Sequence, residues 1–246
     1  MKAKLLIFTS IALAGIITVI AFKAASKNPQ RGVKEEPTVI GNSQMTDKQK
    51  QHSKLFKHSG AKLQELAKRQ AGDIEVEVGL GLTTTVQPES VKLPIFQSAV
   101  CRADAVIVGT ITRKESQLTE DQNFIFTDHE VAVEEILKNN PRAPLASGSS
   151  ISATREGGAV EWNGRIFRVL PEDLDPPATG ERYLMLLHFI PETGAYLMYG
   201  DGTFHLTQQA IRALGPTARA EMDKDKTDPI AFIDRIRTYA LSNCGT

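Results

Sequence analysis

Cysteine is scarce in this chain, with only Cys101 and Cys244 among 246 residues. They form no Cys-x-x-Cys pair, which excludes a zinc ribbon or a thioredoxin-type redox site built on them. In an oxidising compartment two cysteines most simply form one disulfide bond. We therefore predict a Cys101–Cys244 bond that ties the C-terminal tail to the start of the first core strand. Two free thiols or an intermolecular bridge are the alternatives.

An excess of charge is also missing, because Lys+Arg and Asp+Glu both number 29. A balanced charge gives no general argument for nucleic acid, since phosphate binding needs a basic excess. Catalytic motifs are missing too: no Gly-x-Ser-x-Gly occurs, and Gly79-Leu80-Gly81 lacks the third glycine of a dinucleotide site. No spacing assembles a nucleophile, a base and an orienting group, or three metal ligands. The sequence thus nominates no catalytic residue, metal or cofactor.

The N-terminus carries the one long uncharged hydrophobic run. Lys2 and Lys4 precede residues 5–22, which read LLIFTSIALAGIITVIAF. This run is longer than the roughly 7–15 residues of a secretory signal and approaches the roughly 17–25 that span a bilayer. We expect segment 1–27 to be an uncleaved signal-anchor, with a cleaved signal peptide as the alternative. The main domain is then anchored in the cytoplasmic membrane and extracytoplasmic, or else secreted or periplasmic after cleavage.

Residues 28–98 are expected to form a linker with a basic helical spacer and one strand. Thr46-Asp47-Lys48-Gln49 has the spacing of a capping box and starts a helix that breaks near Ser59-Gly60 and ends before Gly72. Its many lysines suit either a solvated spacer, which we favour, or attraction to anionic lipid. Ile74–Leu82 alternates apolar and polar residues, which predicts a half-buried strand.

Residues 99–207 carry a series of β-patterned segments. The apolar centre of Ala105–Thr112 is continuous, so both faces of this strand are expected to be covered, and Gly109 permits a bend. Phe124–Leu137 is a second, long strand. Asn163-Gly164 supplies the positive φ angles of a type I′ turn and predicts a hairpin over Val160–Phe167. Tyr183–Ile190, Ala195–Tyr199 and Thr203–Leu206 predict a three-stranded meander, with Gly200-Asp201-Gly202 as a turn.

Residues 208–246 are expected to be a helical segment that docks on the strands. Gln208–Leu214 has a helical pattern that Gly215 and Pro216 would end. The last helix starts with Asp228 as N-cap and Pro229 at the first helical position. Its apolar residues then recur at helical spacing and predict one buried face: Ile230, Ile233, Ile236, Tyr239 and Ala240.

Three stretches resemble a class of exported bacterial proteins that contain a small β-barrel. They are Cys101–Ile111 (CRADAVIVGTI), Val133–Lys138 (VEEILK) and Gly180–Leu187 (GERYLMLL). The arrangement is similar to the OB-like barrel of netrin-type modules and of tissue inhibitors of metalloproteinases. The resemblance implies the fold but no inhibition, because the inhibitors bind zinc through a cysteine at the mature N-terminus, whereas Cys101 lies deep in the chain.

Two groups of residues are candidates for a site. Asp128, His129 and Glu130 form the densest titratable cluster, in which the two carboxylates share one strand face. They could act as an acid/base pair or cation site, although a solvated strand face is the simpler interpretation. A possible binding face, on which aromatic and basic side chains alternate, consists of Trp162, Arg165, Phe167 and Arg168. His188 and His205 could meet across the meander, whereas His52 and His58 have no visible partner.

The sequence as a whole predicts a mainly β protein with flanking helices. Its parts are a small OB-like β-barrel, an N-terminal transmembrane or signal helix, and a C-terminal amphipathic helix. We expect a membrane-anchored extracytoplasmic binding or scaffolding module without catalytic activity. Its expected partners are the membrane, through residues 5–22, and a protein or glycan, but no nucleic acid. The alternative is a hydrolase whose site forms only in the folded barrel.

Overall fold

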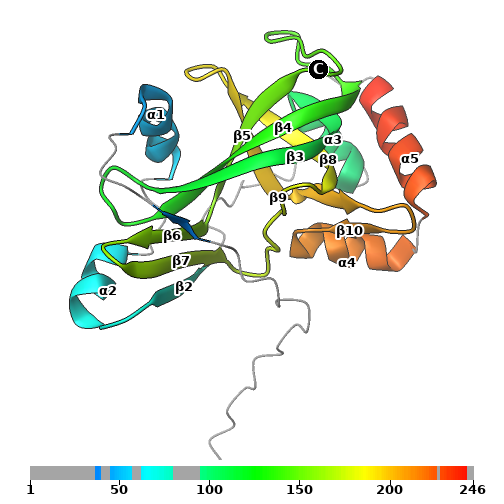
Figure 1. The fold of residues 1–246 in the computed structure, drawn as a ribbon. Coiled ribbons are helices and arrows are strands. Elements are labelled where there is room, and N and C mark those ends of the chain that lie inside the picture. Colours follow the sequence, from blue (N-terminus) through cyan, green and yellow to red (C-terminus); the bar gives the residue numbers. More distant parts are fainter. Residues whose placement is uncertain (1–36, 40–44, 57–61, 80–94, 226–227, 243–246) are drawn as a thin grey trace, which may run out of the picture. The chain divides into compact units, whose positions relative to one another are not determined.

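Two β-sheets with flanking helices make up the computed structural model (Figure 1). The structure describes residues 37–39, 45–56, 62–79, 95–225 and 228–242. All of them belong to one compact unit, Glu35–Thr246. The hydrophobic run 5–22 lies outside the described residues, and among those described no helix is long and apolar enough to cross a membrane. The expected mainly β architecture with flanking helices is confirmed.

The larger sheet has six strands in the order β10-β9-β5-β4-β3-β8, with an additional pairing between β9 and β8. Five of these strands therefore pair in a cycle, in which each strand has two neighbours: β3–β4–β5–β9–β8–β3. The contact of β5 with β9 is parallel and the other four are antiparallel. The bounds are β3 Ala105–Leu118, β4 Ile125–Lys138, β5 Ser150–Glu156, β8 Arg182–Ile190, β9 Ala195–Leu206 and β10 Ile211–Ala213.

The first of these strands is covered on both faces, as its continuous apolar pattern predicts. Val106 and Val108 pack with the helices, whereas Ala105 and Ile107 pack inside the curled sheet. Gly109 lies at a register shift between β3 and β4. A Cβ atom there would come within 2.6 Å of the Ala132 carbonyl oxygen, so only glycine permits this close approach.

The smaller sheet has four strands in the order β1-β6-β7-β2, where β1 is Thr38–Val39, β2 Ile74–Val78, β6 Gly158–Trp162 and β7 Arg165–Pro171. The predicted hairpin is confirmed: Asn163 and Gly164 have φ angles of 51° and 69° between β6 and β7. Strand β2 is confirmed over its described residues, and it pairs in parallel with β7. Because the apolar residues of both strands point to one face, this sheet closes a second apolar cluster against the ends of β3 and β4.

Helices α1 (Asp47–Leu55) and α2 (Leu63–Arg69) occupy the segment expected as a solvated spacer. The predicted capping box is confirmed, since Thr46 and Gln49 bond reciprocally. They are not a fully solvated spacer, however, because each buries one side against the sheets: His52 of α1, Phe56 directly after it and Leu63 of α2 are at most 1% exposed. Phe56 stacks on Phe126 with ring centroids 5.7 Å apart. This segment is therefore part of the folded core.

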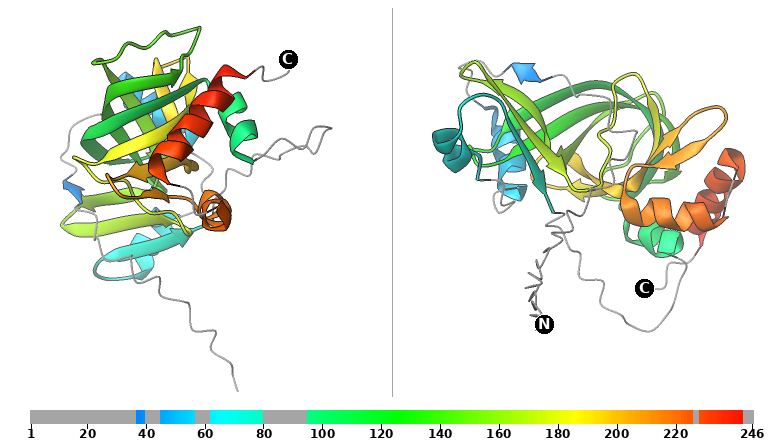
Figure 2. Two further views of the ribbon diagram at one scale, coloured as in Figure 1. Left: turned by 90° about the vertical axis from the view of Figure 1, so that its right-hand side faces the viewer. Right: turned by 90° about the horizontal axis from the view of Figure 1, so that it is seen from below.

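Helices α3 (Ile95–Arg102) and α5 (Pro229–Leu241) lie side by side on the outside of the larger sheet (Figures 1 and 2). The sequence pattern did not indicate α3, whose Phe96 and Val100 are buried against α5. The predicted start of α5 is confirmed: the Asp228 carboxylate accepts hydrogen bonds from two backbone amides. The buried face of α5 is centred on Phe232 and Ile236, whereas Ile230, expected on that face, is 72% exposed.

Two predictions for the C-terminal third are wrong. Gly200-Asp201-Gly202 is not a turn, because one long strand, β9, runs through it. Gln208–Leu214 is not a helix, because Ile211–Ala213 forms β10 and pairs with β9. Gly215-Pro216 then precedes a helix instead of ending one, and α4 spans Pro216–Asp225. The Asp201 carboxylate accepts hydrogen bonds from the amides of Thr217 and Ala218 and so supports the start of α4.

Cys101 lies on α3, directly before the first core strand, where the predicted disulfide needs it. Cys244 lies outside the described residues. No free cysteine is found in the part of the chain that the structure describes. The pairing of the two cysteines stays a prediction.

We expect Gly109→Ala to lower the free energy of unfolding by about 1–3 kcal/mol, because the added methyl group would overlap a backbone carbonyl. Gly79→Ala is the matched control, since its Cβ would meet only Glu172 Oε2 at 3.8 Å. Urea unfolding followed by far-UV circular dichroism measures both variants. Equal stability of the two would contradict the close approach at Gly109.

Candidate functional site

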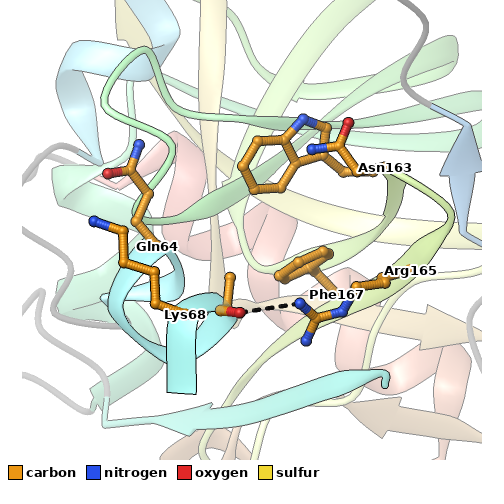
Figure 3. Close-up of a pocket in the computed structure, with 7 residues that line it drawn as sticks. Gln64, Lys68, Asn163, Arg165 and Phe167 are labelled. Carbon is orange, nitrogen blue, oxygen red and sulfur yellow. Dashed lines mark hydrogen bonds between the residues drawn. The ribbon is translucent and has the colours of Figure 1, made fainter. Parts of the chain in front are cut away.

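A pocket of about 370 Å³ lies between helix α2 and the β6–β7 hairpin (Figure 3). Gln64 and Lys68 come from the helix, and they lie across the pocket from Asn163, Arg165 and Phe167 of the hairpin (Figure 3). The full lining is Gln64, Ala67, Lys68, Trp162, Asn163, Arg165 and Phe167. Its volume falls within the roughly 300–1,000 Å³ of small-molecule sites. We refer to it as the hairpin pocket.

Arg165 holds the two walls of the hairpin pocket together. Its guanidinium donates to the carbonyl oxygens of Ala67, Gln70 and Gly72 at 3.1, 2.8 and 2.7 Å. These carbonyls lie at or just past the C-terminal end of α2, where backbone acceptors lack helical partners. A cation at a helix C-terminus is also favoured by the helix dipole. Arg165 is thus a structural clamp that fixes α2 against the hairpin.

Three of the four predicted binding-face residues line the hairpin pocket: Trp162, Arg165 and Phe167. Phe167 is 1% exposed, and its ring centroid lies 5.5 Å from that of the partly exposed Trp162. The Arg165 guanidinium lies 5.3 Å from the centre of the Phe167 ring. Arg168 is the exception: it follows Phe167 on β7 and therefore projects from the opposite face of the sheet.

The charge of the pocket lining is positive. It contains Lys68 and Arg165 and no acidic side chain. Lys68 is exposed in the last turn of α2, whereas the Arg165 charge is engaged with backbone carbonyls. The cation that a ligand can reach is therefore that of Lys68.

Asp128 belongs to a second constellation, which the sequence did not reveal. Asp128 Oδ1 lies 2.7 Å from His52 Nδ1, and His52 Nε2 lies 3.0 Å from Thr193 Oγ1. Because an ionised carboxylate only accepts, Nδ1 donates to Asp128. In a neutral imidazole the Thr193 hydroxyl then donates to Nε2. The expectation that His52 has no partner is wrong, while His58 lies outside the described residues. Hydroxyl, imidazole and carboxylate follow in the order of a hydrolase triad.

Two observations make the Thr193–His52–Asp128 chain a structural clamp. His52 is fully buried on the inner face of α1, so a leaving group could not reach its Nε2 atom. The neighbouring backbone amides are also engaged: those of Thr193 and Gly194 donate to Ile190, and that of Ala195 donates to Thr193 Oγ1. An oxyanion would need such amides as donors. The chain of bonds therefore fastens α1 to β4 and to the β8–β9 turn.

His129 lies on the opposite face of β4, inside the curled sheet. It is 2% exposed, and neither ring nitrogen has a hydrogen-bond partner. The carbonyls of Ala153 and Thr127 lie near enough to favour its proton, but not in hydrogen-bond geometry. Burial, together with the charges of Arg155 and Lys114, lowers the His129 pKa from 6.5 to about 3. The imidazole is therefore neutral at physiological pH.

The other predicted candidates do not converge. Glu130 is exposed and accepts a hydrogen bond from the Ser150 hydroxyl at 3.0 Å. His188 and His205 do not pair across β8 and β9, because they lie opposite Leu197 and Tyr183. His205 instead contacts Glu181 at 2.9 Å. Within the described ranges, no group of three His, Cys, Asp or Glu side chains could hold a metal ion.

Sequence reasoning missed the helical half of the hairpin pocket, namely Gln64, Ala67 and Lys68. No local signal marks these residues, since they belong to a short basic helix almost 100 positions before the hairpin. They reach it because β2, which follows α2, pairs with β7. The pocket is thus a product of one long-range strand pairing.

No protein-family model matches this chain, and no curated sequence matches it significantly. Function is therefore argued from the geometry of the hairpin pocket and of the histidine sites. Fold analogy would in any case not assign an activity, because one fold hosts many functions.

We expect the stability of the protein to fall as pH drops below 6.5, partly through His129. In the unfolded chain the His129 imidazole takes up a proton near pH 6.5, whereas in the folded protein it does so only near pH 3. Between these pH values the folded state binds fewer protons, so a falling pH favours the unfolded state. Each pH unit in that window costs about 1.4 kcal/mol. Urea unfolding at pH 7.5 and 5.0 should show His129→Leu losing about 2 kcal/mol less than wild type.

His205→Gln is the control, because His205 is bonded to Glu181 at the surface and not buried among apolar groups. This variant keeps His129 and should therefore still show the loss that His129 contributes. If His129→Leu kept the full wild-type loss between pH 7.5 and 5.0, His129 would not be a neutral buried imidazole.

Proposed function

We propose that this chain is a membrane-anchored extracytoplasmic binding module without catalytic activity, whose ligand enters the hairpin pocket. The observation that carries the proposal is the combination of side chains that line this pocket. An aromatic pair, Trp162 and Phe167, is combined with the amides of Gln64 and Asn163 and the cation of Lys68. Apolar walls with a few polar groups are typical of ligand sites.

Preorganisation supports binding at this pocket. Arg165 fixes the last turn of α2, and Leu63 at its start is fully buried. Gln64 Nε2 donates to Gln122 Oε1 at 3.0 Å, which orients the Gln64 amide. Because these groups are held before a ligand arrives, little conformational entropy is lost on binding. A stable, half-open aromatic pocket favours recognition over a purely structural role.

The scaffold that we propose for this site is an OB-like barrel. The cyclic order of β3, β4, β5, β9 and β8 supports it, because an OB fold is a five-stranded and partly open Greek-key barrel. The β5–β9 contact comprises two residue pairs, in keeping with a partly open seam. The likeness to netrin-type modules is part of this proposal and concerns architecture alone.

The proposed location rests on the sequence. The uncharged run 5–22 follows two lysines and has the length of a signal-anchor. A cysteine pair that can form a disulfide is in keeping with an oxidising compartment outside the cytoplasm. The ligand is then a molecule of that compartment or of the cell surface, a protein or a glycan, and not a nucleic acid.

We expect the full-length protein in detergent, used as bait on membrane extracts, to retain a specific partner through Trp162. Trp162→Ala should reduce the retained partner at least about tenfold, because the central aromatic of a site contributes a large share of binding. Tyr239→Ala is the matched control, a partly buried aromatic on α5. Unchanged retention by Trp162→Ala, with far-UV circular dichroism confirming the fold of both variants, would contradict the proposal.

The second candidate function is a hydrolase with Thr193 as its nucleophile. The observation in its favour is the hydrogen-bond order Thr193–His52–Asp128, which matches a catalytic triad. The full burial of His52 and the engaged amides of the β8–β9 turn weigh against it. We therefore place it behind the binding module.

Thr193→Val separates the two roles, because it removes the hydroxyl and keeps the shape of the side chain. If the triad is a clamp, the free energy of unfolding falls by about 1–2 kcal/mol, and hydrolysis of p-nitrophenyl acetate does not change. A wild-type hydrolysis rate above buffer that is lost in Thr193→Val and retained in Thr193→Ser would favour the hydrolase instead.

A further inference from the structure

We infer that the hairpin pocket selects an acidic saccharide, a sugar residue that carries a carboxylate. This inference rests on the proposed binding function and names its ligand class. A pyranose ring has an apolar C–H face and a polar rim of hydroxyls. The pocket offers a matching pair of surfaces: the indole of Trp162 beside the Phe167 ring, and amides on both walls.

The position of the polar groups supports a sugar over a purely apolar ligand. Gln64 lies on α2 and Asn163 on the hairpin, so their side chains belong to opposite walls of the pocket (Figure 3). Each amide has donors and an acceptor, as each sugar hydroxyl does. Gln64 is already oriented by its bond to Gln122, which leaves its carbonyl oxygen for a ligand hydroxyl. Asn163 is exposed at the tip of the type I′ turn.

The charge of the lining supports an anionic sugar over a neutral one. Lys68 and Arg165 are the charged residues of the lining, and both are basic. The Arg165 guanidinium is bound to three carbonyl oxygens of the α2 end, so a ligand carboxylate would be met by the Lys68 ammonium. The nearest acidic residue along α2, Glu65, is paired with Arg69 at 3.9 Å and does not line the pocket.

In the complex that we infer, the apolar C–H face of the sugar ring stacks on the indole of Trp162. Its hydroxyls bond to Gln64 and Asn163, and its carboxylate contacts Lys68. Nucleic acid fits less well, because the balanced charge of the chain provides no basic track for a phosphate backbone. An acidic peptide would use Lys68 but would leave the aromatic surface without its stacking partner.

Trp162 is the only tryptophan of the chain, so its fluorescence reports directly on the pocket. The full-length protein in detergent is titrated with trigalacturonic acid, with its methyl ester and with triglutamate. The ester keeps the sugar face and loses the charge, whereas triglutamate keeps the charge and loses the sugar face. We expect the acid to bind about fivefold tighter than the ester at low salt, as for one exposed ion pair. Triglutamate should bind at least about tenfold more weakly than the acid.

Lys68→Gln should abolish the difference between acid and ester. Lys54→Gln, which removes an exposed lysine of α1 outside the pocket, should preserve it. The difference should also shrink in 0.5 M salt, because exposed charges are screened. Equal binding of acid and ester by wild type would overturn the selection of an acidic sugar, and so would triglutamate binding as tightly as the acid.

The same titrations separate the failure of this inference from that of the binding function. If no saccharide changes the fluorescence, but a membrane partner is retained through Trp162, the binding function stands and the saccharide inference is overturned. If no saccharide binds and Trp162→Ala retains as much partner as wild type, both are overturned.

Discussion

One antiparallel pair of strands supports the whole structure. Strands β3 and β4 have 14 residues each, long enough to border all three apolar clusters. At one end Val106, Val108 and Leu137 face the helices, and in the middle Ile107, Ile111 and Val133 fill the curled sheet. At the other end Leu118, Ile125 and Phe126 form the floor under α1 and the smaller sheet. Burial on both sides of one ladder couples these clusters, because a shift in its register would disrupt all of them.

The hairpin pocket depends on this ladder through a second layer of contacts. The smaller sheet packs on the far ends of β3 and β4, and it brings β2 and the preceding α2 next to the hairpin. Arg165 then joins the end of α2 to β7 by three bonds to carbonyl oxygens. The residues that meet a ligand are at the surface, but the elements that carry them are anchored in the apolar cluster. Such support from rigid elements is what a preorganised site requires.

The buried histidines illustrate how position decides the role of a titratable group. His52 and His129 are both buried, on opposite faces of β4. His52 lies on α1 and contacts one face of the strand by its hydrogen bond to Asp128, whereas His129 is a residue of the strand and points to the other face. His52 has two partners and serves as a clamp between α1, β4 and the β8–β9 turn. His129 has none for either nitrogen, so burial holds its pKa far below the ordinary value. The first adds a polar link between α1 and the strands beneath it, and the second makes stability depend on pH.

Local chemistry in the sequence determined several features by itself. Asn163-Gly164 specified the hairpin turn, the Thr46–Gln49 box and Asp228-Pro229 specified two helix starts, and the apolar run from Ala105 specified a strand covered on both faces. These signals succeed because each depends on neighbours within a few residues. Three of the pocket residues, Trp162, Arg165 and Phe167, were also recognisable from alternating aromatic and basic side chains.

Tertiary structure alone decided the rest. Gly200-Asp201-Gly202 has turn composition, yet β9 runs through it, because the residues on both sides of it pair with β8 across a register shift. Gln208–Leu214 has a helical pattern, yet Ile211–Ala213 forms a strand, because its pairing gives hydrogen-bond partners to the backbone groups at the edge of β9. The contacts of His52 with Asp128 and of α2 with the hairpin join residues from 76 to 98 positions apart. No local pattern encodes such contacts, because they arise from the packing of distant apolar faces and not from the preferences of neighbouring residues.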